Sequence, residues 1–186
     1  MSQPRTVAVL IGSLRKESFT RKTVRALQEV APAGLKLEIV EIGHLPFYNE
    51  DLEADPPPQW VEFRNKVRGV DAVLFASPEY NRSVPAALKN AIDVGSRPYG
   101  SSVYAGKAAA VLTVSPGVIG GFGANHHLRQ SLVFLDMPVL QQPEGYLGGV
   151  AKWFDAEGRL TDESARQFLT RFAAAFAVWI DRVASD

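Results

Sequence analysis

A hydroxyl-rich segment near the start of the chain has residue types suited to binding a phosphate group. The segment is Gly12-Ser-Leu-Arg-Lys-Glu-Ser-Phe-Thr20, and its hydroxyls belong to Ser13, Ser18 and Thr20. If the segment joins a buried strand to a helix, it can hold one phosphate. The contributions come from free amides at the helix start, the helix dipole, these hydroxyls and the Arg15 guanidinium. The alternative is that the hydroxyls only cap the helix and that Arg15 is solvated.

Glycine spacing separates this segment from two common nucleotide-binding loops. After Gly12, the positions that hold glycine in the dinucleotide-binding pattern contain Leu14 and Glu17. A second stretch, Gly100 to Lys107, resembles a P-loop, but it has five residues between its glycines and Ala108 where Ser or Thr is needed. The spacing therefore favours a mononucleotide.

Two further loops have chemistry suited to a planar ring. Ser77-Pro-Glu-Tyr-Asn-Arg-Ser-Val-Pro85 contains two prolines, so a stiff backbone lines the polar edge of a heteroaromatic ring while Tyr80 offers a flat face. The alternative is an ordinary strand-to-helix turn with Ser83 as the helix cap. Ser115-Pro-Gly-Val-Ile-Gly-Gly-Phe-Gly123 has glycines that let backbone approach a ligand closely, or that only make the loop flexible.

Short apolar runs alternate with helical periods along the chain, which predicts a parallel sheet covered on both faces. The expected strands are 7–11, 35–42, 72–76, 108–114 and a short fifth at 138–140. The last helix is expected to be capped by Thr161 and to bury a stripe formed by Phe168, Phe172, Phe176, Trp179 and Val183. Right-handed crossovers then give a doubly wound, flavodoxin-like α/β fold with strand order 2-1-3-4-5. In that order, ligands bind beyond the strand ends where the winding reverses, between the first and third strands.

Bulk composition bounds the class of protein. The length predicts one domain over residues 1–186. Lys and Arg together number 20, as do Asp and Glu, so the formal net charge is zero, which argues against nucleic acid or an anionic membrane as a partner. The absence of cysteine excludes disulfides, thiolate metal sites and thiol redox chemistry. No stretch approaches a signal peptide or membrane span, so the default location is the cytoplasm.

Together, several motifs resemble the NADPH-dependent FMN reductase family, and within it the bacterial soluble quinone and chromate reductases. They are Gly12–Arg15 with Ser18–Thr20, Pro78–Asn81 followed by Ser83–Pro85, Leu88–Asp93, His127–Gln130, and Pro143-Glu144 with Gly148-Gly149. The resemblance covers nearly the whole chain. Between Gly120 and His127 the chain departs from some relatives, which are more basic and aromatic there.

The resemblance implies a flavodoxin-like homodimer or homotetramer with non-covalent FMN. It implies that NADH or NADPH reduces the flavin, which passes electrons to quinones and, less selectively, to chromate, azo dyes or other acceptors in a ping-pong cycle. No side chain is then catalytic, and no metal is expected, because the cofactor carries the chemistry. The implied FMN contacts are Ser13, Leu14, Arg15, Ser18, Phe19 and Thr20 at the phosphate, Pro78, Glu79, Tyr80 and Asn81 along the ring, and Ser115, Pro116 and Gly117 on its other side.

Two other functions fit the same fold. A flavodoxin-type electron carrier is usually strongly acidic, and the balanced charge here argues against it. A regulatory or interaction module without cofactor would not need intact phosphate and ring loops. The sequence leaves open the physiological acceptor and the choice between NADH and NADPH.

Overall fold

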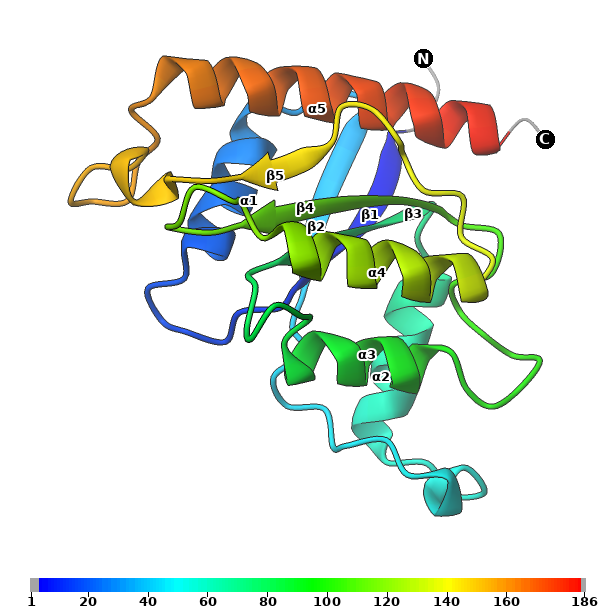
Figure 1. The fold of residues 1–186 in the computed structure, drawn as a ribbon. Helices are drawn as coiled ribbons and strands as arrows, with labels where there is room; N and C mark the ends of the chain where they lie inside the picture. Colours follow the sequence, from blue (N-terminus) through cyan, green and yellow to red (C-terminus); the bar gives the residue numbers. More distant parts are fainter. Residues whose placement is uncertain (1–3, 185–186) are drawn as a thin grey trace.

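The structure, a computed structural model, describes residues 4–184 and contains one five-stranded sheet (Figure 1). Its strands are β1 (Arg5–Ile11), β2 (Leu35–Val40), β3 (Ala72–Ser77), β4 (Ala108–Val114) and β5 (Gly145–Leu147). All neighbouring strands are parallel and their order is β2-β1-β3-β4-β5. This confirms the predicted flavodoxin-like α/β fold.

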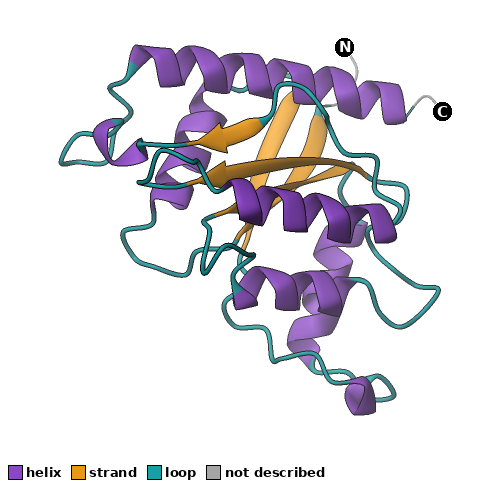
Figure 2. Cartoon of the chain, in the orientation of Figure 1, coloured by secondary structure: helices purple, strands orange, loops and turns teal. Residues whose placement is uncertain are grey.

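Helices cover both faces of the sheet (Figure 2). Helices α1 (Phe19–Val30) and α5 (Glu163–Val183) pack on one face, and α2 (Pro58–Arg68), α3 (Ala86–Gly95) and α4 (Phe122–Phe134) pack on the other. Short 3₁₀ helices lie at Glu50–Leu52 and Val150–Lys152. Strands β3 and β4 are buried along their whole length, which explains why all their residues except Ser77 and Thr113 are apolar. Among the helices between residues 4 and 184, none is long and apolar enough to span a membrane.

The fifth strand lies later in the chain than predicted. Residues 138–140 make only an isolated bridge, Ala109 with Val139, and β5 begins at Gly145. A Cβ atom at position 145 would lie 2.8 Å from both Leu112 Cδ1 and the Val111 carbonyl oxygen. Glycine therefore allows the close approach that pairing with β4 requires at this point, and the prediction of 138–140 as the strand is wrong.

The start of α5 also differs from the prediction. Asp162, not Thr161, is the N-cap, and its carboxylate accepts a hydrogen bond from the Ala165 amide at 2.8 Å. The Thr161 hydroxyl instead donates to the Trp153 carbonyl at 3.2 Å. The fully buried face of α5 consists of Ala165, Leu169, Phe172, Ala173, Phe176 and Ile180, whereas Phe168, Trp179 and Val183 are only partly buried at its margin.

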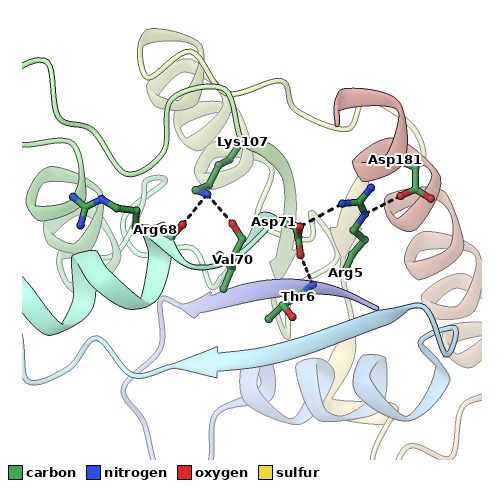
Figure 3. A network of polar contacts seen from close by, with 7 residues as sticks. All are labelled: Arg5, Thr6, Arg68, Val70, Asp71, Lys107 and Asp181. Carbon is green, nitrogen blue, oxygen red and sulfur yellow. Dashed lines mark hydrogen bonds and ion pairs between the residues drawn. The ribbon is translucent and has the colours of Figure 1, made fainter. Parts of the chain in front are cut away.

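A polar network ties together the amino ends of the central strands (Figure 3). The Asp71 carboxylate accepts from the Thr6 amide at 2.7 Å, and Arg5 bridges Asp71 and Asp181 at 3.4 and 3.0 Å. Lys107 Nζ donates to the Val70 carbonyl at 2.7 Å, and burial lowers the pKa of this lysine. This network secures the edge of the sheet opposite to the loops predicted to bind a ligand.

Candidate functional site

The first predicted loop leaves the carboxyl end of β1 and leads directly into α1. Ser18 is the N-cap of the helix, and its hydroxyl accepts a hydrogen bond from the Arg21 amide at 3.2 Å. The capping alternative is therefore correct for Ser18. Within the described residues, the amides of Phe19 and Thr20 donate no hydrogen bond, so two N–H groups at the positive end of α1 are available to an anion.

Two hydroxyls beside these amides also lack partners. Ser13 is 4% exposed and Thr20 is 2% exposed, yet neither side chain is hydrogen-bonded to another residue of the 4–184 range. Neither hydroxyl oxygen is among the buried unpartnered atoms of the described residues, so both reach the surface beside the free amides, where they can bind an exogenous acceptor such as phosphate. Arg15 is exposed and forms no ion pair with any described residue, which leaves its guanidinium available to the same ligand.

A glycine at the end of β1 brings the first loop against the second. Gly12 donates its amide to the Ala76 carbonyl at 2.8 Å. A Cβ atom here would lie 3.0 Å from Ser77 Oγ and 3.2 Å from a Leu88 methyl carbon, tighter than most Cβ contacts. The absence of a side chain therefore lets the loops after β1 and β3 lie side by side, as the strand order predicts.

The second loop contains a tight turn with strained backbone. Tyr80 and Ser83 exchange backbone hydrogen bonds at 3.1 and 3.0 Å, and the residues between them, Asn81 and Arg82, have φ of 51° and 62°. Asparagine tolerates the left-handed region, whereas arginine at such an angle costs on the order of 1 kcal/mol. Tyr80 is 45% exposed at this turn. The turn therefore places Tyr80 at the surface of the predicted ring-binding loop.

Ser83 is not a helix cap, so that alternative for the second loop is wrong. Helix α3 begins after Pro85, which makes no side-chain capping bond. Ser83 Oγ instead lies 2.9 Å from Nδ1 of His127 on α4. The contact links the second loop to α4 through His127.

Glu79 forms a second link between this loop and α4. Its side chain is 12% exposed, and one carboxylate oxygen accepts from the Ala124 amide at 3.0 Å. Gly121, the N-cap of α4, offers no side chain, so Glu79 serves as the cap from 45 residues away. This capping role of Glu79 was not predicted from the sequence, because no local pattern reveals a partner 45 residues away.

The third loop is held against the segment that follows β5. The Ser115 amide donates to the Leu147 carbonyl at 2.8 Å, and the Gly149 amide donates to the Gly117 carbonyl at 3.2 Å. Gly148 permits this packing, because a Cβ atom there would lie 2.5 Å from the Val118 carbonyl oxygen. Pro116 and Gly117 are exposed at the tip. The glycine-rich loop is thus held by defined backbone hydrogen bonds at Ser115 and Gly117.

A buried polar cluster beneath the third loop fixes its far end. Thr113 Oγ1 donates to the Gly120 carbonyl at 2.8 Å, and Asn125 Nδ2 lies 3.3 Å from the same hydroxyl oxygen. Asn125 is fully buried on α4 and accepts from Arg129 Nε at 2.9 Å. Neither Thr113 nor Asn125 was singled out from the sequence, although a polar residue within an apolar strand is a signal for such a role.

The segment between Gly120 and His127 contributes to a cluster of aromatic rings with Tyr146. His126 packs against Phe122, with ring centroids 4.1 Å apart, and its ring is parallel to that of Tyr146. The Tyr146 hydroxyl donates to Glu144 at 2.9 Å and lies 3.2 Å from His126 Nε2. Burial, assisted by the Glu144 hydrogen bond, raises the pKa of Tyr146.

A cavity of about 430 Å³ opens between the first two loops. Leu14, Arg15 and Tyr80 line it together with Gly12 and residues 85–87. This cavity is not lined by Ser115, Pro116 or Gly117. The loop that contains them leads into α4, and α4 is joined to the second loop by the Glu79 hydrogen bond. A larger groove, of about 670 Å³, runs along α5 beside Leu140, and none of the residues predicted to contact FMN lines it.

Known proteins resemble this chain in sequence over most of its length. Residues 5–152 match the model of the family described as NADPH-dependent FMN reductase. The chain is 63% identical over 181 residues to a quinone reductase of Pseudomonas putida, covering 97% of each chain. It is 39% identical over 174 residues to a 2-hydroxy-1,4-benzoquinone reductase of a Burkholderia species, covering 94% of this chain and 95% of the relative.

A solved structure shows the same fold at high similarity. The flavoenzyme NAD(P)H:(acceptor) oxidoreductase FerB from Paracoccus denitrificans superimposes with a TM-score of 0.90 and 43% identity, covering 96% of this chain and 98% of FerB. The family match spans all three loops and the strands that carry them. This chain belongs to the NADPH-dependent FMN reductase family.

Proposed function

We propose that this protein is an NAD(P)H-dependent quinone reductase that uses non-covalent FMN. The observation that carries the proposal is the first loop, where the hydroxyls of Ser13 and Thr20, which have no partner among the described residues, lie beside two free amides at the start of α1. This donor set fits the FMN phosphate, with Ser13, Ser18, Phe19 and Thr20 around it and Arg15 completing the charge. The names of the P. putida relative and of FerB support the same class of reaction.

The second and third loops supply the remainder of the proposed flavin site. Pro78, Glu79, Tyr80 and Asn81 hold the ring edge, with Leu14 beside them, and residues 115–117 approach its other side. When bound, FMN supplies two-electron redox chemistry between the nicotinamide and the acceptor. The protein's residues bind the phosphate, orient the ring and keep one face open, so no side chain is proposed as catalytic. Reduction of chromate or azo compounds is proposed as a secondary activity of the same open face.

Apolar side chains around this site favour self-association. Five are exposed by about half or more: Leu14 at 57%, Tyr80 at 45%, Val118 at 92%, Ile119 at 54% and Phe122 at 51%. Zero net charge provides little repulsion between copies. We therefore propose a homodimer or homotetramer in which a second copy covers part of this rim.

Steady-state kinetics on FMN-loaded protein test the proposed function. With NADH or NADPH and a panel of benzoquinones and naphthoquinones, we expect parallel lines in double-reciprocal plots, because acceptor follows nicotinamide onto one surface. Protein that takes up no FMN contradicts the proposal and leaves a cofactor-free module. Yellow protein that NADPH reduces only slowly, but a separate reductase reduces rapidly, contradicts it in favour of an electron carrier.

A further inference from the structure

A second cavity, of about 270 Å³, lies beside the first turns of α1 and is lined mainly by charged side chains. Four of these are basic: Lys16, Arg21, Lys22 and Arg25. The opposite wall is the tip of a hairpin at residues 156–158, far away in the sequence. Only the tertiary structure brings these two segments together.

The hairpin is packed firmly against α1. The Phe154 ring stacks on Phe19 with centroids 6.5 Å apart, and a bridge between Phe154 and Leu160 closes the hairpin. Gly158 has φ of +80°, and a Cβ atom there would lie 3.3 Å from Lys22 Cε. The walls of the cavity are therefore held by packing at a defined separation.

The positive charges in this cavity are only partly compensated. Arg21 forms two hydrogen bonds with the Glu41 carboxylate at 2.7 and 2.8 Å, and Lys22 pairs with Glu17 at 2.9 Å. Lys16 and Arg25, in contrast, form no ion pair with any residue between 4 and 184. The remaining acidic residue of the lining, Glu157, pairs with Arg159 outside the cavity at 3.1 Å.

The cavity adjoins the proposed flavin site. Lys16 follows Arg15, which lines the first cavity, and Ser18 lines the second. Ser18, Lys22 and Arg25 are spaced by four and three residues, so they share one face of α1. At 1.5 Å per residue, this face leads about 10 Å along the helix away from the proposed FMN phosphate.

We propose that this cavity binds the 2′-phosphate of NADPH, so that Lys16 and Arg25 make the protein prefer NADPH to NADH. The proposal rests on the function proposed above. A phosphate monoester carries a charge of roughly −1.5 to −2 at neutral pH, which is opposite in sign to the two cations of the lining that form no ion pair. Arginine additionally offers a planar pair of donors to phosphate oxygens. NADH has a hydroxyl at that position and gains neither contribution.

The test compares Arg25→Gln and Lys16→Gln with a control, Arg68→Gln, whose exposed side chain lies on α2 at the other face of the sheet. For each cavity variant we expect KM for NADPH to rise about fivefold, the effect of losing a partly exposed ion pair. KM for NADH, and kcat with either nucleotide, should remain unchanged. Unchanged KM for NADPH, or equal rises for both nucleotides, would overturn the proposal.

Calorimetry provides a second readout that does not depend on turnover. Adenosine 2′,5′-bisphosphate should bind the FMN-loaded protein more tightly than adenosine 5′-monophosphate, and Arg25→Gln should remove most of the difference. Equal binding of the two probes to the unmodified protein would contradict a 2′-phosphate site.

An FMN titration distinguishes the two phosphates that this region could hold. We expect the Kd for FMN to be the same in Arg25→Gln as in the unmodified protein. A weakened FMN complex would assign the cavity to the flavin phosphate and overturn the proposal. Quinone reduction with NADH, measured on the same preparations, reports on the proposed function separately, because NADH does not use this cavity.

Discussion

Replacing Gly123 with alanine tests whether close contact between α4 and the second loop positions the flavin site. Gly123 lies in the first turn of α4, where a Cβ atom would be 2.5 Å from the Arg82 carbonyl oxygen and 3.1 Å from a Glu79 carboxylate oxygen. The nearer atom belongs to the backbone of the strained turn, which therefore has to move or be separated from the helix.

The expected magnitude follows from two opposing effects. Alanine is favoured over glycine within a helix by up to about 1 kcal/mol. Overpacking against a fixed backbone costs about 1–3 kcal/mol. We therefore expect the free energy of unfolding to fall by about 0–2 kcal/mol. Displacing the turn also removes ring contacts, and the Kd for FMN should rise about tenfold, the effect of roughly one hydrogen bond.

Urea unfolding and quenching of flavin fluorescence measure the two quantities. Two other glycines serve as controls: Gly34, where a Cβ atom meets nothing within 4 Å, and Gly95, where it would lie 2.5 Å from the Tyr104 ring. Gly34→Ala should change neither quantity appreciably, and Gly95→Ala should lower stability without weakening FMN binding. A Gly123→Ala protein with unchanged stability and unchanged Kd for FMN would refute the reasoning.

Two further predictions concern Arg15, which precedes α1, and the ion pair between Arg21 on α1 and Glu41. Arg15→Ala should weaken FMN binding by roughly 1.5–3 kcal/mol, the scale of a hydrogen bond to a charged group, and unchanged affinity in a fluorescence titration would remove Arg15 from the site. The Arg21 hydrogen bond lowers the pKa of Glu41 below its ordinary 4.5, so this exposed pair stabilises the fold above that pH and loses its contribution as pH falls through the lowered value. Urea unfolding of Glu41→Gln should accordingly show a small deficit at pH 7 that disappears once the pH falls below the lowered pKa of Glu41; a deficit independent of pH would contradict the assignment.

Helix α4 contacts two of the loops that we propose form the flavin site. Glu79 reaches the start of the helix from the second loop, His127 contacts Ser83, and Asn125 holds the buried cluster under the third loop. Helix α4 thus connects the loop at residues 77–85 with the glycine-rich loop at residues 115–123. A substitution in the first turn of α4 is therefore expected to shift the backbone of both loops.

The sequence by itself determined the fold class, and the chemistry that it predicts for the loops is the basis of the proposed site. Continuous apolar runs such as 72–76 predict strands buried on both faces, and helical spacing predicts the covering helices, because these patterns record burial locally. The hydroxyl-rich loop before α1 and the missing dinucleotide glycines were also readable from the order of residues. That residues 1–186 form one domain remains a prediction.

Tertiary structure alone decided which distant groups meet. The fifth strand is at Gly145 because only a residue without a side chain fits against Leu112 there. The cap of α4 comes from Glu79, and the basic cavity beside α1 is completed by the hairpin at 156–158. Local periodicity specifies which face of an element is buried, but it carries no information about close approach between segments far apart in the chain. Those approaches bring together the loops after β1 and β3 and place the charged cavity beside the start of α1.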